Sequence, residues 1–193
     1  MKTCHEACLT SDKKSPRMIL PGATLGLLGG GQLGRMFTIA ARTMGYEVMV
    51  LDPDTESPAA TFATEHLCAP YTDTEALARL ARECAAVTTE FENVLPSSLE
   101  MIAEHIPVRP SADNIRVARD RILEKKTIRD IGLKTVEYHV ILTREDFESA
   151  LQAISLPAIL KTATLGYDGK GQIMISQPSD LDTAFYTLGA NPC

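Results

Sequence analysis

The residues best suited to chemistry lie in a glycine-rich loop near the end of the sequence. Ala158–Ala163 is short and apolar, and Gln172–Ser176 alternates in polarity, so the two segments predict a hairpin. Glycines in the connecting loop let backbone N–H groups turn toward an anion, and lysines add charges that suit phosphate. No Gly-Lys-Ser/Thr opens a helix here, so this is not a Walker A loop. The candidate residues are Lys161, Gly166, Tyr167, Asp168, Gly169, Lys170, Gly171 and Gln172.

The pattern favours a flap that covers a phosphate, and an ordinary hairpin with a mobile turn is the alternative.

A second glycine motif, Gly29–Gly34, satisfies G-x-G-x-x-G between the apolar segment Thr24–Gly29 and a predicted helix. A second strand, Glu47–Asp52, follows and ends in an acid, which completes the βαβ fingerprint of a nucleotide-type fold. The turn could hold a phosphate at the helix start. Asp52 could instead cap the turn at Pro53–Ser57.

The helix after this turn is predicted to pack through one apolar face. Gly45 is suited to the position that ends the helix. Residues at helical spacing that make up the predicted face are Leu33, Met36, Phe37, Ala40, Ala41 and Met44.

Two acids lie at the C-terminal end of the predicted strand Val87–Glu90, at the sheet edge where open α/β folds bind ligands. Glu90 and Glu92 could contact an amine or hydroxyl of a substrate, or they could be solvated loop acids. The chain from Thr24 to Arg109 reads as alternating strands and helices, which is typical of a parallel sheet. The further elements expected there are a short helix from Ser57-Pro58, a strand at His66–Ala69, a helix opened by Thr72-x-x-Glu75, a helix at Ser97–His105 and an edge strand at Ile106–Arg109.

The second half of the chain is predicted to begin a separate α+β unit, with the boundary between Pro110 and Gly132. A helical region through Ile131 carries a basic face, which usually means solvation. Thr143-x-x-Asp146 caps a further helix ahead of the hairpin, and Asp180–Leu188 looks helical. The basic face consists of Arg116, Arg119, Arg121, Lys125, Lys126 and Arg129.

Composition excludes several classes of protein. The chain has 193 residues, 45% of them apolar, and a formal charge of −6, which argues against nucleic-acid and anionic-membrane partners. An odd number of cysteines, five, without a CxxC pair fits a reduced, cytoplasmic setting. Residues 1–17 are polar, so we expect a disordered tail, in which Cys4, His5 and Cys8 are incidental rather than a metal site.

Four motifs in this order and spacing resemble the N5-carboxyaminoimidazole ribonucleotide synthetase family: LPGATLGLLGGGQLGRM, TTEFENV, DRILEKK and AILKTATLGYDGKGQ. The resemblance implies a Rossmann-like, parallel-sheet pre-ATP-grasp lobe over residues 18–115, followed by the incomplete start of an α+β ATP-grasp domain over residues 116–193. The family carboxylates 5-aminoimidazole ribonucleotide with bicarbonate and ATP in purine biosynthesis. Its phosphoryl transfer depends on positioning and on charge neutralisation.

By the same resemblance, Arg121 and Lys161 contact ATP phosphates, and Lys161 and Lys170 act in catalysis. The loop Gly166–Gln172 closes over the nucleotide. The residues that face the aminoimidazole ribonucleotide would be Gln32, Leu33, Glu90, Tyr167 and Asp168.

The family is about twice as long as this chain, and its Mg²⁺ ligands lie beyond Cys193. We therefore expect no turnover by these 193 residues alone. The resemblance also implies a homodimer when the protein is full length. Two other readings remain open: an NAD-dependent dehydrogenase, based on Gly29, Gly31, Gly34 and Asp52, and a non-catalytic fragment that binds a nucleotide or a partner. Among relatives, formate-dependent glycinamide ribonucleotide transformylase shares the architecture but fits the motifs less well.

Overall fold

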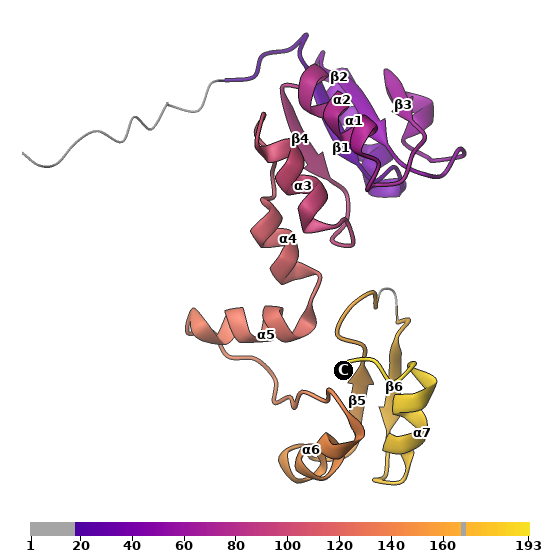
Figure 1. Cartoon of the computed structure of the whole chain (residues 1–193), viewed down its shortest axis with the longest axis vertical. Helices are drawn as coiled ribbons and strands as arrows, with labels where there is room; N and C mark the ends of the chain where they lie inside the picture. Colours follow the sequence, from indigo (N-terminus) through magenta and orange to yellow (C-terminus); the bar gives the residue numbers. More distant parts are fainter. Residues whose placement is uncertain (1–17, 167–168) are drawn as a thin grey trace, which may run out of the picture.

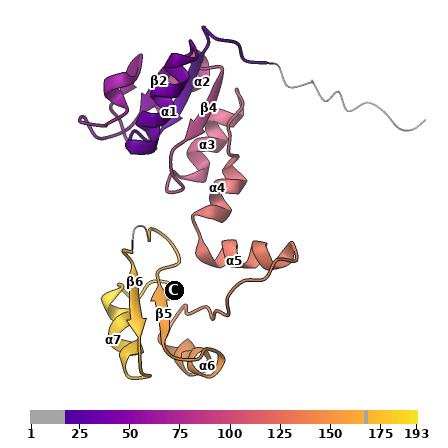
Figure 2. The same ribbon diagram turned by 180° about the vertical axis from the view of Figure 1, so that it is seen from behind.

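The chain folds into two lobes joined by a pair of helices (Figure 1). The structure is a computed structural model that describes residues 18–166 and 169–193. The predicted tail, residues 1–17, lies outside the described residues. The joining helices are α4 (Ala112–Ala118) and α5 (Arg121–Asp130), and the view from behind shows the same separation of the lobes (Figure 2).

The N-terminal lobe contains a parallel sheet of four strands. They are β1 (Thr24–Leu28), β2 (Glu47–Leu51), β3 (Glu65–Leu67) and β4 (Ala86–Thr89), in the order β3-β2-β1-β4. All three pairings are parallel. The predicted Rossmann-like parallel sheet is confirmed, and the carboxyl ends of β1, β2 and β4 meet along one edge.

Helices cover both faces of this sheet. Leu27 of β1 packs toward α1 (Gln32–Thr43), whereas Leu28 packs toward α2 (Thr74–Glu83) and α3 (Pro96–Ala103). The alternation follows from the period of two along a strand. Each face therefore has its own buried cluster, as expected of a doubly wound fold.

The buried face of α1 differs from the predicted one. Its buried residues are Gly34, Thr38 and Ala41, whereas Leu33 and Met36 are 64% and 65% exposed. Gly34 lies so close to the sheet that a Cβ there would be 2.7 Å from the carbonyl oxygen of Gly29. The helix packs closely through small residues, so Ala41 of the predicted face is buried and Phe37 is partly buried, whereas Leu33, Met36 and Met44 stay outside.

Several predicted element boundaries are also corrected. Asp73, not Thr72, caps α2, because its side chain accepts a hydrogen bond from the Ala76 amide at 2.8 Å. The helix expected from Ser57-Pro58 is a single 3₁₀ turn, η1 (Ala60–Phe62). The expected edge strand near Val108 is one isolated parallel bridge to Val87.

The joining segment, expected as one helical region, is broken into two helices at Asp120. Its carboxylate accepts hydrogen bonds from the amides of Ile122 at 2.8 Å and Leu123 at 3.1 Å. A side chain that caps one helix in this way ends the preceding one, because the backbone of a cap residue is extended.

The C-terminal lobe is a hairpin backed by helices. The strands β5 (Ala158–Lys161) and β6 (Gln172–Ile175) pair antiparallel, as predicted. Helix α6 (Phe147–Ala153), which follows the 3₁₀ turn η2 (Arg144–Asp146), and α7 (Asp180–Thr187) pack on one face of the hairpin. The buried residues of this face are Ile141, Ala150, Leu160, Ile175, Leu181, Ala184 and Phe185.

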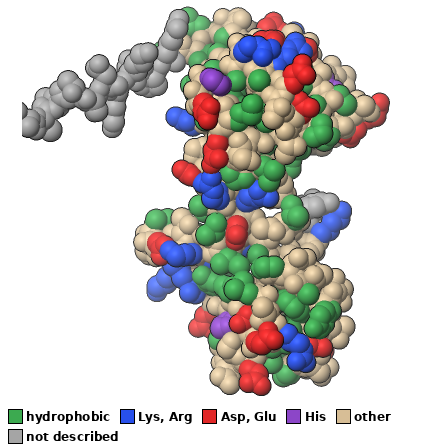
Figure 3. All heavy atoms as spheres, in the orientation of Figure 1, with side chains coloured by type: hydrophobic (Ala, Val, Ile, Leu, Met, Phe, Trp, Pro, Cys, Tyr) green, Lys and Arg blue, Asp and Glu red, His purple; other side chains and the backbone are tan. Residues whose placement is uncertain are grey.

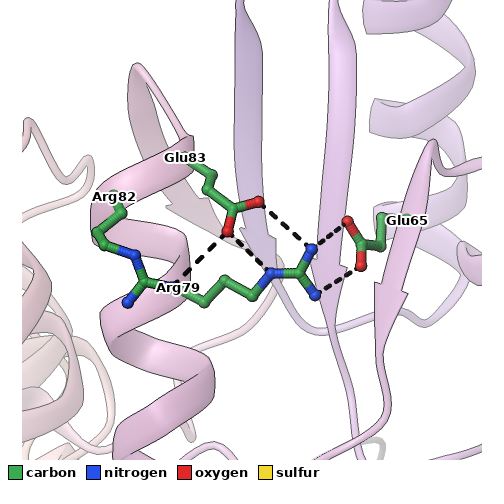
Figure 4. A network of polar contacts seen from close by, with 4 residues as sticks. All are labelled: Glu65, Arg79, Arg82 and Glu83. Carbon is green, nitrogen blue, oxygen red and sulfur yellow. Dashed lines mark hydrogen bonds and ion pairs between the residues drawn. The ribbon is translucent and has the colours of Figure 1, made fainter.

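The outer edge of the N-terminal sheet is tied to α2 by a polar network (Figure 4). Arg79 of α2 forms ion pairs with Glu65 of β3 at 2.6 Å and with Glu83 at 3.0 Å. Hydrogen bonds to Glu83 and then Glu65 raise the pKa of the Arg79 guanidinium. Exposed ion pairs of this kind contribute little to stability. The network therefore links β3 to α2 without being a main source of the free energy of folding.

The two described cysteines of this lobe should differ in reactivity. Cys84 is buried and desolvation raises its pKa to about 12, whereas Cys68 is exposed. Because the thiolate is the reactive form, iodoacetamide at pH 8 should alkylate Cys68 and spare Cys84. Peptide mass spectrometry measures both, and labelling in denaturant is the control in which both react. Equal rates in the native protein would contradict the packing described for Cys84.

The cap of the C-terminal lobe predicts a pH dependence. The Asp146 carboxylate accepts from the amides of Thr143 at 2.9 Å and Leu142 at 2.8 Å, and these bonds lower its pKa. A lowered pKa adds stability above the unfolded-state value of about 3.9, and this stability is lost as the pH falls through the folded-state pKa. Asp146→Asn should therefore lower the melting temperature of the lobe at pH 7.

The same substitution should make no difference at a pH below the folded-state pKa of Asp146, where the carboxyl group is protonated in both states. Circular dichroism melts at several pH values measure this. Glu148→Gln removes the same charge from an exposed position of α6 and serves as the control. A loss of stability with Asp146→Asn that persists undiminished in acid would refute the role of the charge.

Candidate functional site

The first glycine motif forms the turn between β1 and α1, as predicted. Gly29 has a φ of 97°, and helix α1 begins at Gln32. Two acids from the neighbouring strands reach this turn. The Gly30 amide donates to Asp52 at 2.7 Å and the Gly31 amide donates to Glu90 at 2.5 Å. The two amides that directly precede α1 are thus bonded to carboxylates of the protein itself.

Asp52 is buried and engaged on both oxygens. One oxygen accepts from Gly30 and from the Tyr71 hydroxyl at 2.7 Å, and the other accepts from the Asp54 amide at 2.8 Å. Burial, and then the hydrogen bond to Asp52, raise the pKa of Tyr71. The turn-capping reading of Asp52 is confirmed by the bond to Asp54. A carboxylate held in this way is poorly placed to bind the ribose of a dinucleotide, so the dehydrogenase reading is not favoured.

Glu90 belongs to the glycine turn rather than to solvent. A Cβ at Gly31 would lie 2.4 Å from one of its carboxylate oxygens, so only glycine allows this approach. A carboxylate at a helix N-terminus is favoured by the helix dipole. Gln32 and Leu33, the other predicted substrate contacts of this lobe, are exposed in the first turn of the same helix.

The start of α5 connects the two lobes. The Arg121 amide donates to the carbonyl of Ala163 at 2.8 Å, and its guanidinium contacts the carbonyl of Gly166 at 3.4 Å. The first predicted phosphate contact, Arg121, thus lies against the glycine loop of the hairpin.

The hairpin brings the second set of predicted residues together. Lys161 at the end of β5 is paired with Gln172 at the start of β6, and the Thr162 amide donates to Gly171 at 2.9 Å. Gly169 and Gly171 have φ values of 80° and 70°, which favour glycine. Lys170 lies between them, whereas Tyr167 and Asp168 lie outside the described residues.

A cavity of about 320 Å³ lies where the joining helices meet both lobes. One wall comes from the loop after β4, a second from the α4–α5 junction, and a third from the glycine loop. Figure 3 shows Lys and Arg side chains gathered at the narrow waist between the lobes. The residues that line the cavity are Glu92, Asn93, Ala118, Arg119, Arg121, Glu124 and Ala163–Gly166.

A second, larger cavity of about 650 Å³ runs between α5, residues 136–141, α6 and β5. Lys161 and Arg121 both line it, and its walls are mainly apolar. Arg121 thus faces both cavities. Gln32, Leu33 and Glu90 line neither, so the predicted site residues fall into two groups.

Sequence reasoning missed part of the first cavity. Arg119, Asn93 and Glu124 line it, but the sequence assigned Arg119 to a solvated basic face. The signal that could have found it is the break at Asp120, which puts Arg119 and Arg121 on either side of a helix cap rather than along one helix.

Comparison with known proteins agrees with this architecture. Residues 22–119 match the ribonucleotide synthetase preATP-grasp domain, and residues 126–193 match the ATP-grasp domain. N5-carboxyaminoimidazole ribonucleotide synthase of Pseudomonas aeruginosa is 44% identical over 88% of this chain and 47% of its own length.

Solved structures give the same result. The ADP complex of an N5-carboxyaminoimidazole ribonucleotide synthetase has a TM-score of 0.87 and 38% identity, over 93% of this chain and 48% of that one. The Aspergillus clavatus synthase, in complex with ADP and 5-aminoimidazole ribonucleotide, has a TM-score of 0.76 and 28% identity, over 88% and 45%. The chain spans about half the length of the relatives that it matches.

The parallel sheet, the glycine hairpin and these matches agree over both lobes. The chain belongs to the ribonucleotide synthetase preATP-grasp family, its second lobe matches the ATP-grasp domain, and it is similar to proteins named N5-carboxyaminoimidazole ribonucleotide synthetase over about half of their length.

Proposed function

We propose that this protein takes part in the ATP-dependent carboxylation of 5-aminoimidazole ribonucleotide with bicarbonate, in purine biosynthesis. The observation that carries the proposal is the glycine hairpin, with Lys161 at its base and Arg121 against its loop. Its support is the relative solved with ADP and 5-aminoimidazole ribonucleotide, which covers 88% of this chain.

The open face of the hairpin suits a nucleotide. Ile159 and Met174 are paired across the strands and are 50% and 57% exposed, and Lys161 and Gln172 follow on the same face. An apolar pair can cover the flat face of a base, while an ammonium group contacts phosphates. We assign ATP binding to Arg121, Lys161 and Gly166–Gln172, and a role in phosphoryl transfer to Lys161 and Lys170.

We assign the ribonucleotide substrate to the other group of residues. Gln32 and Leu33 are exposed at the start of α1, beside the carboxylate of Glu90. Tyr167 and Asp168 complete this assignment by resemblance. The glycine loop must then approach the N-terminal lobe, because the two groups of residues lie on different lobes.

ATP fits the residues present, whereas Mg²⁺ does not. The residues described by the structure include no group of three or more His, Cys, Asp or Glu side chains that could hold a metal ion. We therefore assign no Mg²⁺ ligand within this part of the chain. Arg121, Lys161 and Lys170 would supply positive charge to the phosphates here.

Two further properties are proposed from the family resemblance: a homodimer when the protein is full length, and a cytoplasmic location. None of the helices in the described residues is long and apolar enough to cross a bilayer. Sedimentation of a full-length form would test the homodimer.

Calorimetric titration of the 193-residue chain with ATP, 5-aminoimidazole ribonucleotide and NADH tests the proposed function. We expect ATP and the ribonucleotide to bind and NADH not to bind. Binding of NADH alone would support the dehydrogenase, and binding of ATP without the ribonucleotide would support a nucleotide-binding module. ADP release that depends on bicarbonate and the ribonucleotide is measured for the 193-residue chain and, in parallel, for a full-length relative. We expect such release from the full-length relative and none from the 193 residues alone.

Lys161→Ala should weaken the binding of ATP. A charge-assisted contact of this kind contributes about 1.5–3 kcal/mol, which corresponds to about tenfold to a hundredfold in the dissociation constant. Lys126→Ala is the matched control, because Lys126 pairs with Asp130 and lines neither cavity. An ATP dissociation constant that Lys161→Ala leaves unchanged would remove Lys161 from the site.

A further inference from the structure

Arg119 has an unusual environment for an arginine of this protein. It is half-buried at the end of α4 and lines the cavity of about 320 Å³. Its side chain forms no hydrogen bond or ion pair with any residue in the ranges 18–166 and 169–193. Arg116, one turn earlier, pairs with Asp113 and Glu100. A guanidinium that is partly withdrawn from water loses hydration that a bound anion would replace.

The cavity sets Arg119 beside Arg121. The residue between them, Asp120, uses one carboxylate oxygen to accept the first amides of α5, and it forms no ion pair with either arginine. Glu92 and Glu124 also line the cavity, but in the described residues neither forms an ion pair with the two arginines. Two guanidinium groups therefore share one cavity, and no carboxylate in the part of the chain that the structure describes is paired with either of them.

We propose that Arg119 is a second phosphate-binding residue, which together with Arg121 holds a phosphate group of a nucleotide in this cavity. Guanidinium groups bind phosphate through paired N–H donors, and two of them match its tetrahedral oxygens. Glu92 and Asn93 on the opposite wall supply acceptors for hydroxyl or amine groups of the same ligand. The inference rests on the proposed function and adds a residue that the motifs do not assign.

Both ligands of the proposed reaction carry phosphate, so the experiment must separate them. The variants Arg119→Ala, Arg119→Lys and Arg116→Ala are made in the 193-residue chain, and calorimetry measures the binding of ADP and of 5-aminoimidazole ribonucleotide. Arg119→Ala should weaken the binding of one of the two ligands about tenfold to a hundredfold. Arg119→Lys should fall between, since it keeps the charge but loses the paired donors. Arg116→Ala should change neither.

A loss confined to ADP assigns the nucleotide phosphates to Arg119, and a loss confined to the ribonucleotide assigns its 5′-phosphate. Normal binding of both ligands by Arg119→Ala would overturn the role of Arg119 while the proposed function stands. Failure of the unsubstituted chain to bind either ligand would overturn both. Circular dichroism melts check that each variant folds, and Arg119→Gln replaces the alanine variant if that one does not.

Discussion

The N-terminal lobe depends on the close approach of two carboxylates to one glycine turn. Asp52 directly follows β2 and Glu90 directly follows β4. Their carboxylates accept hydrogen bonds from the consecutive amides of Gly30 and Gly31. A side chain on either glycine would collide, with Ser57 in one case and Glu90 in the other. The turn thereby ties both neighbours of β1 to the start of α1. Charge-assisted bonds to backbone amides are about twice as strong as neutral ones, so these two contacts hold β2 and β4 firmly to the turn.

The joining helices connect this lobe to the second lobe through defined contacts. Helix α3 packs on α4, which ends at Asp120, and the amide of Arg121 bonds to Ala163 just beyond β5. A single helix through this segment would have carried Arg119 and Arg121 along one solvated rod. The cap at Asp120 instead turns the chain where the loop after β4 and the glycine loop approach, and a cavity forms at that place. The position of the arginines is therefore a consequence of helix capping.

Much of the fold could be predicted because its signals are local. The strand, glycine turn and helix around Gly29 need only an apolar run and the conformational freedom of glycine. The face of α1 was predicted only in part, through Phe37 and Ala41, because periodicity favours large residues, whereas close packing also used Gly34 and Thr38. The hydrogen-bond partners of Asp52 and the location of Arg119 could not be predicted from the sequence. Both depend on residues distant in sequence, such as Tyr71 and Gly166, which only the folded chain brings near.

The two glycine motifs look alike in sequence, yet they are not chemically equivalent. In the first, the amides of Gly30 and Gly31 donate to acids of the protein, so these two amides are not free to bind a phosphate. In the second, Gly169 is open, with the nearest atom to an added Cβ at 3.8 Å, whereas Gly171 lies close to Thr162, and the side chains of Lys161 and Arg121 beside the loop are cations. Anion binding by a glycine-rich turn thus depends on the charge of the side chains that converge on it. The acids that follow the neighbouring strands, rather than the glycines, separate the motif that shapes the fold from the motif proposed to bind phosphate.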